Sequence, residues 1–171
     1  FKERVTEVCN RIGANPKEQL KSVGSLGSGN HFIEVDTDSH GNKWLIIHSG
    51  SRNFGLSVAE YYQKKAEEYV VENKFDSKMP FLEEELMKEY MESVVVAQEF
   101  ASENRKIMAN KIIKFLKADK IIESFETVHN YIDTVDNIIR KGAISAKADE
   151  KIVIPLNMRD GIIIAKGKGN S

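Results

Sequence analysis

The side chains best suited to metal chemistry in this sequence are histidines, and three of the four share a similar setting. His31 follows Ser-Gly-Asn, His48 ends an apolar run before Ser-Gly-Ser-Arg, and His129 lies in Thr-Val-His-Asn-Tyr. Each stands at the end of an expected strand, beside small or amide residues, where a side chain can point into a cleft. Because neutral imidazole binds manganese, zinc and iron, the three together indicate a metal site. Each one alone fits a hydrogen-bonded core histidine equally well. His40, in an Asp-Ser-His-Gly turn, is interpreted as a solvated turn residue.

Two glycine-rich segments are candidates for binding phosphate. Residues 24–30 read Gly-Ser-Leu-Gly-Ser-Gly-Asn, and residues 166–170 read Lys-Gly-Lys-Gly-Asn. Backbone N–H groups in such loops can form concavities for anions. The first loop lacks the Gly-Lys-Ser/Thr ending of a nucleotide-binding P-loop, and it suits a flexible approach to a strand equally well. Arg52, four residues after His48, is either a phosphate ligand or a surface arginine.

Glu34 is the carboxylate most open to a functional interpretation. It alternates with Phe32 along the expected strand, so the two side chains share one face. A carboxylate beside an aromatic ring could bind the edge of a nucleobase, and it could equally be a charge on an edge strand. The acidic and basic residues of the helical segments are interpreted as solvated faces.

The elements that must position these residues alternate between strand and helix patterns. Residues 31–35 and 43–47 predict a β-hairpin around a turn at 38–42. Helical spacing is found at 1–12, at 56–73, and at 81–116, which is long enough for two helices or one bent helix. Pro80 suits the first turn of this last segment. The remaining expected strands cover 123–132, 151–155 and 161–165.

Two apolar stripes are expected on the long helical segments. The first consists of Val58, Tyr62, Ala66, Tyr69 and Val70, and the second of Val94, Ala97, Ala101, Asn104 and Met108. The small residues of the second stripe predict close packing. The order of strands, helices and strands predicts an α+β fold with a mixed β-sheet and a helical layer from about 56 to 117. We expect one domain over residues 1–171.

Composition excludes several classes of protein. The chain has 171 residues, 41% of them hydrophobic, with 25 Lys and Arg against 26 Asp and Glu. These values exclude a disordered or collagen-like chain and argue against a histone-like coat of positive charge. No apolar run approaches the length of a membrane span, so no membrane association is expected. The single cysteine, Cys9, excludes an internal disulfide framework and suits a reducing, cytoplasmic location.

Taken together, these motifs resemble those of RtcB-type RNA-splicing ligases. The resemblance runs from about Leu20 to the last residue. The matching elements are, in chain order, Gly24-Ser25-Leu26-Gly27-Ser28-Gly29-Asn30-His31-Phe32-Ile33-Glu34, His48-Ser49-Gly50-Ser51-Arg52, Ala101 with Asn104-Arg105, His129-Asn130, Lys141-Gly142-Ala143, Ile154-Pro155 with Met158, and Gly167-Lys168-Gly169-Asn170.

The resemblance implies a GTP- and Mn²⁺-dependent RNA ligase with a two-metal site. Such an enzyme joins RNA ending in a 3′-phosphate or 2′,3′-cyclic phosphate to RNA with a 5′-hydroxyl, through a GMP-activated end. The implied metal ligands are His31, His48 and His129, and Arg52 is a candidate contact to RNA phosphate. Glu34 would read guanine. The implied nucleotide-binding residues are Asn30, His31, Phe32, Ile33, Glu34, His129, Asn130, Pro155, Leu156, Asn157 and Met158.

The sequence also departs from the family pattern. The Asp and Cys metal ligands of the family lie far upstream of the Gly-Asn-His element, and Cys9 is in a different context. Residues 155–158 read Pro-Leu-Asn-Met where many members have Pro-Gly-Ser-Met, and Ile162 stands where many have serine. The histidine that accepts GMP in the family follows the Gly-Lys-Gly-Asn element. We therefore expect the central part of a ligase, with no catalytic nucleophile in this sequence and no covalent label from GTP.

The sequence is also compatible with two alternatives to a ligase segment. The first is a non-catalytic metal- or nucleotide-binding module that acts with a partner. The second is a metal-dependent hydrolase that uses the three histidines alone, which the order of the motifs disfavours. The sequence leaves open whether the RNA would be a spliced tRNA or a damaged RNA under repair.

Overall fold

The computed structural model describes residues 1–75, 78–118, 120–133, 135, 138–157 and 159–169. The chain divides into two compact units, Phe1–Leu116 and Lys117–Ser171. Four helices and three two-stranded antiparallel sheets are found in the described residues, which confirms the α+β class. Each described strand pairs only with its neighbour in the sequence, whereas one mixed sheet was expected. The single domain over 1–171 stays a prediction.

The first unit begins with two short helices. Helix α1, Lys2–Ile12, buries Val5, Val8 and Cys9 and ends at Gly13, whose positive φ of 72° suits a residue without a side chain. Helix α2, Pro16–Lys21, was not expected from the sequence. The signal for it is present, because Asn15 accepts hydrogen bonds from the N–H groups of Lys17 and Glu18, and Pro16 occupies the first helical position.

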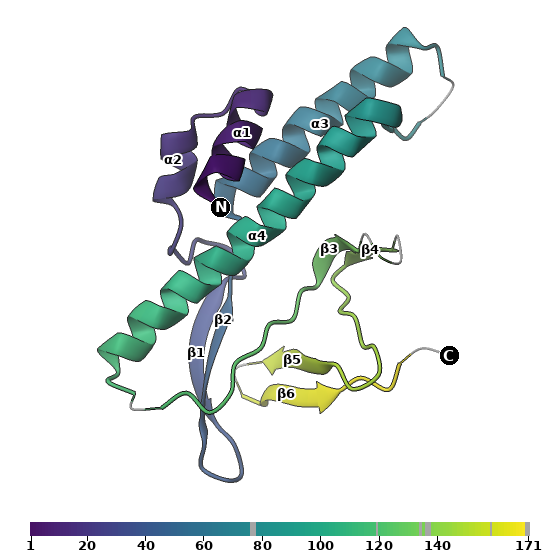
Figure 1. Ribbon diagram of the computed structural model, residues 1–171. Coiled ribbons are helices and arrows are strands. Elements are labelled where there is room, and N and C mark those ends of the chain that lie inside the picture. The colour runs from purple at the N-terminus through teal and green to yellow at the C-terminus, as the bar shows by residue number, and fades with distance from the viewer. Residues whose placement is uncertain (76–77, 119, 134, 136–137, 158, 170–171) are drawn as a thin grey trace. The chain divides into compact units, whose positions relative to one another are not determined.

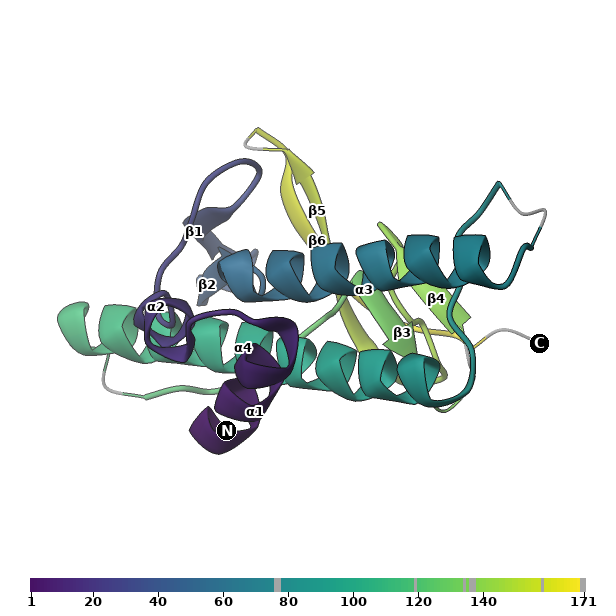
Figure 2. The same ribbon diagram turned by 90° about the horizontal axis from the view of Figure 1, so that it is seen from above.

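The predicted helical layer is confirmed and consists of two long helices, with a single helix in the segment expected at 81–116. Helix α3 covers Arg52–Glu72 and helix α4 covers Glu84–Phe115, and the two lie side by side with α1 and α2 against them (Figures 1 and 2). Pro80 precedes α4 instead of lying in its first turn, so that expectation is wrong. The aromatic rings of Phe75 and Phe81 pack with Tyr69, and the Tyr69 hydroxyl donates to Glu83, so the segment before α4 is held against α3 in a non-helical conformation.

The buried face of α4 follows a single row of residues four apart. Val96, Phe100, Asn104 and Met108 are buried, as is Ser93. Of the expected stripe, Asn104 and Met108 are buried, whereas Val94, Ala97 and Ala101 are half-buried at its edge, and Ala97 packs against the core. Phe100 is completely buried and stacks on Phe54 of α3, with ring centroids 5.1 Å apart. These rings, with the apolar face of α1, form the core of this unit.

The predicted hairpin is confirmed by strands β1, Phe32–Thr37, and β2, Lys43–His48. The register pairs Phe32 with His48 and Glu34 with Ile46, so these side chains share one face. The turn is organised by the Asp38 carboxylate. It accepts hydrogen bonds from the backbone N–H groups of His40 and Asn42, the Asn42 amide and the Trp44 indole. These bonds hold the pKa of Asp38 well below its ordinary value of 3.8.

This turn gives a prediction about acid stability. A depressed folded-state pKa contributes stability that is present above the ordinary value of 3.8 and is lost as pH falls toward the lower folded value. Fluorescence of Trp44, the only tryptophan, should therefore keep its native form until the pH falls below about 4. In Asp38→Asn the emission should already differ at neutral pH. Identical acid titrations of the two proteins would contradict this assignment.

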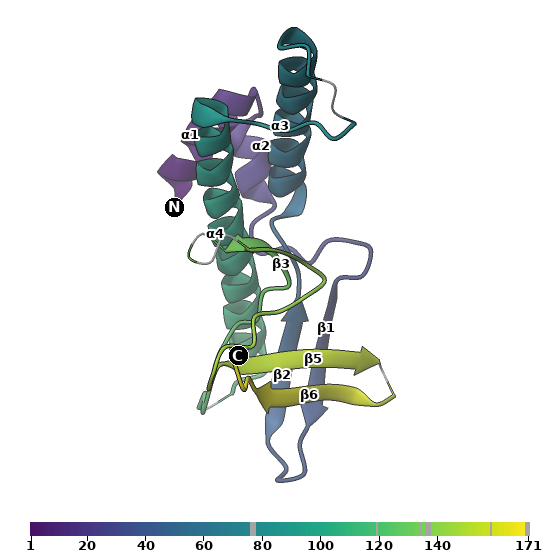
Figure 3. The same ribbon diagram turned by 90° about the vertical axis from the view of Figure 1, so that its right-hand side faces the viewer.

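The second unit consists of two hairpins. Strand β3, Asn130–Asp133, pairs with β4, Ile138–Lys141 (Figure 2). Strand β5, Lys151–Asn157, pairs with β6, Gly161–Lys166 (Figure 3). The last two strands were predicted, but residues 123–129 are irregular, so the strand expected at 123–132 is mostly wrong. Hydrogen bonds that involve side chains take the place of strand pairing in this segment. One of them runs from the Val153 N–H to the Thr127 hydroxyl.

The backbone directly after β6 is packed so closely that only glycine fits at position 167. A Cβ atom at this position would lie 2.3 Å from the carbonyl oxygen of Lys147, a separation that real side chains do not show. The Gly167 N–H donates to the Glu150 carbonyl, and Gly169 donates to that of Ala146. The second glycine-rich segment is therefore packed closely against residues 146–150. None of the described helices combines the length and apolar character needed to span a membrane.

Candidate functional site

His31 and His48 lie close together, at the end of the first hairpin where β1 begins and β2 ends. Their ring centroids are 5.7 Å apart, with the planes tilted by 47°. Phe32 packs edge-on against His48, with ring centroids 5.3 Å apart, because the two residues face each other in the strand register. Both histidines are half-buried. Hairpin pairing thus brings together two imidazoles that are separate in the sequence.

The orientation of the His31 ring is fixed by a backbone carbonyl. Its Nδ1 atom lies 2.9 Å from the carbonyl oxygen of Leu26. A carbonyl can only accept, so the bond requires a proton on Nδ1 and leaves the Nε2 lone pair for a ligand. A Cβ built on Gly50 would lie 4.0 Å from Nε2, so Gly50 leaves space beside this atom. This arrangement, an imidazole oriented through its second nitrogen, is typical of metal-binding histidines.

Arg52 is part of this site. Its Nε donates to the Ser25 hydroxyl at 3.3 Å, and its Nη1 lies 3.3 Å from Nδ1 of His31. A guanidinium can only donate, so this last contact is not a hydrogen bond when Nδ1 carries the proton that it donates to Leu26 at the shorter distance of 2.9 Å. The guanidinium covers Gly27, where an added Cβ would lie 1.7 Å from Nη1. Arg52 also has a positive φ of 57°, at the start of α3. Of the two readings of Arg52, the structure therefore favours a positioned cation over an isolated surface arginine.

The predicted nucleotide-binding residues on the first unit have different exposures. Asn30 and Ile33 are exposed, whereas Phe32 and Glu34 are half-buried on the face that carries His48. Burial raises the pKa of Glu34, and the adjacent carboxylate of Asp36 raises it further. A hydrogen-bond donor or a cation next to Glu34 would therefore stabilise the charged form of its carboxylate.

Asn104 is a site residue that the sequence indicated only as part of a helical face and a family motif. Its fully buried side chain on α4 binds both segments of the site, at residues 24–25 and 49–50. Beside it, Arg105 donates to the carbonyl oxygen of Ser49 at 2.9 Å. The predicted helical layer therefore holds the histidine-bearing loops by polar contacts.

The candidate residues of the second unit are held by turns of their own. The half-buried His129 accepts a hydrogen bond from the Ala143 N–H at its carbonyl, and the Asn130 side chain accepts one from the Gly142 N–H. Pro155, Leu156 and Asn157 are exposed.

The Asn157 side chain closes the β5–β6 turn by accepting from the N–H groups of Arg159 and Asp160. Ile162, on the partner strand, is half-buried. Met158 lies outside the described residues.

The convergence of His129 with His31 and His48 stays a prediction. Within the described part of the chain, no three His, Cys, Asp or Glu side chains are grouped closely enough to hold an ion. The two imidazoles of the first unit are a pair of donors of the kind that first-row transition-metal ions bind. His40 is exposed in the hairpin turn, as expected.

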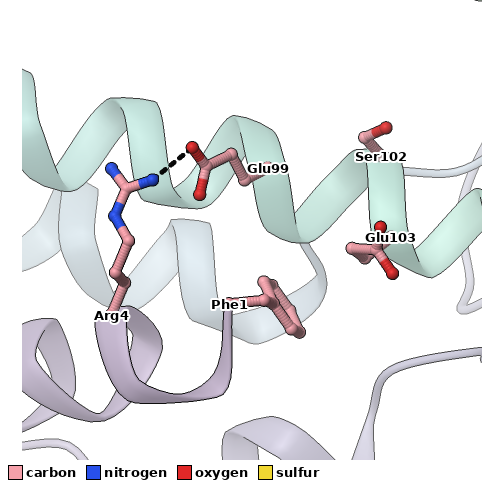
Figure 4. A pocket seen from close by; sticks show the side chains of 5 residues that line it. All are labelled: Phe1, Arg4, Glu99, Ser102 and Glu103. Atoms are coloured by element: carbon pink, nitrogen blue, oxygen red, sulfur yellow. Dashed lines mark hydrogen bonds and ion pairs between the residues drawn. The ribbon is translucent and has the colours of Figure 1, made fainter.

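A separate pocket lies between α1 and α4 and contains none of the candidate residues. Its lining consists of Phe1, Arg4, Glu99, Ser102 and Glu103, and Arg4 forms an ion pair with Glu99 (Figure 4). Both charged partners are substantially exposed. Exposed pairs of this kind contribute little to stability.

Comparison with known proteins identifies the family. The sequence profile described as "RtcB: tRNA-splicing ligase RtcB" matches residues 6–171. The chain belongs to the RtcB family. It is 32% identical to the RNA-splicing ligase RtcB of Escherichia coli strain K12 over 171 residues, which cover 88% of this chain and 42% of that protein. It is 25% identical to the tRNA-splicing ligase RtcB of Pyrobaculum aerophilum over 197 residues, which cover 91% of this chain and 40% of that protein.

This RtcB family chain thus spans less than half the length of the curated relatives it matches. No solved structure gives a significant match. The profile match includes the glycine-rich loop, both histidines of the first unit and the candidate residues of the second unit.

Proposed function

We propose that this chain forms part of an RNA ligase that joins RNA 3′-phosphate or 2′,3′-cyclic phosphate ends to 5′-hydroxyl ends. The observation that carries the proposal is the family match over residues 6–171. The RtcB relatives are named as RNA-splicing and tRNA-splicing ligases. The paired imidazoles of His31 and His48 at a glycine-rich loop support the same conclusion, because they suit a cation beside a phosphate group.

In this proposal His31, His48 and His129 hold Mn²⁺, in the two-metal site that the family resemblance implies. Bound Mn²⁺ would neutralise charge on the phosphate oxygens during displacement at phosphorus. The Leu26 carbonyl keeps the His31 ring in the tautomer with an available Nε2 atom. Arg52 would contribute a fixed positive charge for an RNA phosphate, held by Ser25 over Gly27.

The nucleotide in this proposal is GTP, which supplies GMP to activate the RNA 3′ end. Residues 30–34 would line the base and ribose, and Glu34 would accept from the N–H donors of guanine. Asn130 and residues 155–158 would contact the phosphates. The alternative, a non-catalytic module that binds metal or nucleotide and acts with a partner, predicts the same binding but no joined RNA.

Glu34 gives a specific prediction for nucleotide selection. A carboxylate that accepts hydrogen bonds from guanine discriminates against adenine, which lacks the matching donors at that edge. Replacement of Glu34 by glutamine should reduce the preference for GTP over ATP by roughly tenfold, because a charge-assisted bond is worth about 1.5–3 kcal/mol. Competition binding with labelled GTP in the presence of Mn²⁺ measures this ratio.

Glu60→Gln serves as the matched control for Glu34→Gln. Glu60 is exposed on α3, so its substitution makes the same change of charge without removing the proposed guanine acceptor or the Asp36 carboxylate beside it. An unchanged GTP/ATP ratio in Glu34→Gln, or an equal change in both variants, would contradict the assignment.

The function itself is tested by binding and by ligation. We expect Mn²⁺-dependent binding of GTP that is weakened in His31→Ala and His48→Ala and retained in His40→Ala. For ligation, the E. coli relative with its matching region replaced by this chain should join RNA with a 3′-phosphate to RNA with a 5′-hydroxyl. A folded chimera that binds GTP and Mn²⁺ but produces no joined RNA would favour the non-catalytic module.

A further inference from the structure

The buried row on α4 contains one side chain that is out of place in an apolar core. Asn104 is completely buried, between Phe100 one turn before it and Met108 one turn after it. Burying an amide without partners costs several kcal/mol, on the order of 2–7 depending on the reference state. A non-polar residue would continue the row without this cost. The position of Asn104 therefore requires an explanation in its contacts.

All the hydrogen-bonding capacity of the Asn104 amide is used. Its Oδ1 accepts from the N–H groups of Gly24 at 2.7 Å and Ser25 at 3.1 Å. Its Nδ2 donates to the Ser49 hydroxyl at 3.0 Å and to the Gly50 carbonyl at 3.1 Å. One side chain thus connects α4 to the glycine-rich loop and to the residues directly after His48.

These bonds continue to His31 through a single carbonyl group. The Ser49 hydroxyl accepts from Asn104, and it donates to the Leu26 carbonyl at 2.8 Å. The same carbonyl oxygen accepts from Nδ1 of His31 at 2.9 Å. The amide N–H of Asn104 can only donate to Ser49, which leaves the Ser49 proton for the Leu26 carbonyl, and this carbonyl can only accept from Nδ1 of His31. Asn104 and Ser49 therefore hold in place the acceptor that selects the His31 tautomer.

We propose that Asn104 is a positioning residue for His31: through Ser49 it holds the Leu26 carbonyl in the place where it fixes the tautomer and the orientation of the imidazole, leaving Nε2 available as the metal-binding nitrogen. The role in metal binding rests on the proposed function, whereas the control of the His31 tautomer does not. Residues that orient a metal-binding histidine without touching the metal commonly act in this way, and their loss lowers metal affinity by roughly 10- to 100-fold.

The test uses two variants of this chain. Asn104→Asp keeps the acceptor for Gly24 and Ser25, but its second oxygen draws the Ser49 proton away from Leu26. Ser49→Ala removes the hydroxyl link and leaves Asn104 in place. Nitrogen NMR of the His31 ring in metal-free protein should show the Nδ1–H tautomer in the unsubstituted chain and a larger Nε2–H fraction in both variants. Affinity for Mn²⁺ should fall by roughly tenfold or more.

Ser93→Ala is the matched control. Ser93 is also completely buried on α4, where it bonds to the Tyr62 hydroxyl and the Glu89 carbonyl and has no link to His31. Its loss should reduce stability without changing the His31 tautomer. An unchanged tautomer in the folded variants, or an equal change in Ser93→Ala, overturns the proposal. If Asn104→Asp does not fold, Ser49→Ala decides the question. A tautomer change with no Mn²⁺ binding in the unsubstituted chain would refute the proposed function and leave the positioning role intact.

Discussion

Replacing His48 by alanine is expected to lower the affinity of the chain for Mn²⁺ by more than roughly 10- to 100-fold. A loss of that size is typical when a residue that only orients a metal ligand is removed, whereas His48 is itself a proposed ligand. The reason is that His48 supplies one of the two imidazoles that the first hairpin brings together, with ring centroids 5.7 Å apart. Calorimetric or electron paramagnetic resonance titration with Mn²⁺ measures the change.

His40→Ala is the control for His48→Ala. Both histidines belong to the same hairpin region, but His40 is exposed in the turn at its opposite end. Its substitution should leave Mn²⁺ affinity unchanged. Because His48 also packs edge-on against Phe32, thermal unfolding of each variant should be recorded. Equal Mn²⁺ affinity in the His48 and His40 variants would remove His48 from the metal site.

The largest effect on stability is expected from Phe100→Ala. Phe100 is fully buried, stacks on Phe54 and lies 5.8 Å from the ring of Phe1, so its removal leaves a cavity where α1, α3 and α4 meet. Truncation of a buried phenylalanine costs about 3–5 kcal/mol. Denaturant unfolding followed by circular dichroism should show a loss of this size, because most of the helical residues lie in this unit.

The same substitution at Phe115 provides the control. Phe115 is on the same helix but is 83% exposed, so alanine should change the free energy of unfolding by no more than about 0.5 kcal/mol. Similar losses in the two variants would mean that the core lies elsewhere.

Local patterns in the sequence predicted the parts of the fold that depend on neighbouring residues. The hairpin around Asp38 and the helices α1, α3 and α4 have clear periodicity, and the hairpin pairing places the rings of His31 and His48 beside each other. Helix α2 was missed because six residues give too short a periodic signal, although Asn15 and Pro16 mark its start. Strand β4, only four residues long, was missed for the same reason.

Contacts between distant residues could not be predicted in this way. Asn104 binds residues 80 and 55 positions away, and nothing in its local sequence specifies these partners. The alternating patterns likewise do not specify which strand pairs with which, so a mixed sheet was expected where the described strands form separate hairpins. Residues 123–129 show strand-like alternation but have side-chain partners instead of a neighbouring strand, which explains the incorrect prediction there.

The central claim, that His31, His48 and His129 share a Mn²⁺ site, is tested most directly by paramagnetic broadening of the histidine ring signals. Because broadening by Mn²⁺ depends steeply on distance, substoichiometric metal reports the nearest rings even when binding is weak. We predict early and parallel loss of the ring signals of His31, His48 and His129, with His40 retained. Broadening of His40 at the same Mn²⁺ concentration, or a His129 signal that persists after those of His31 and His48 have disappeared, would contradict the shared site.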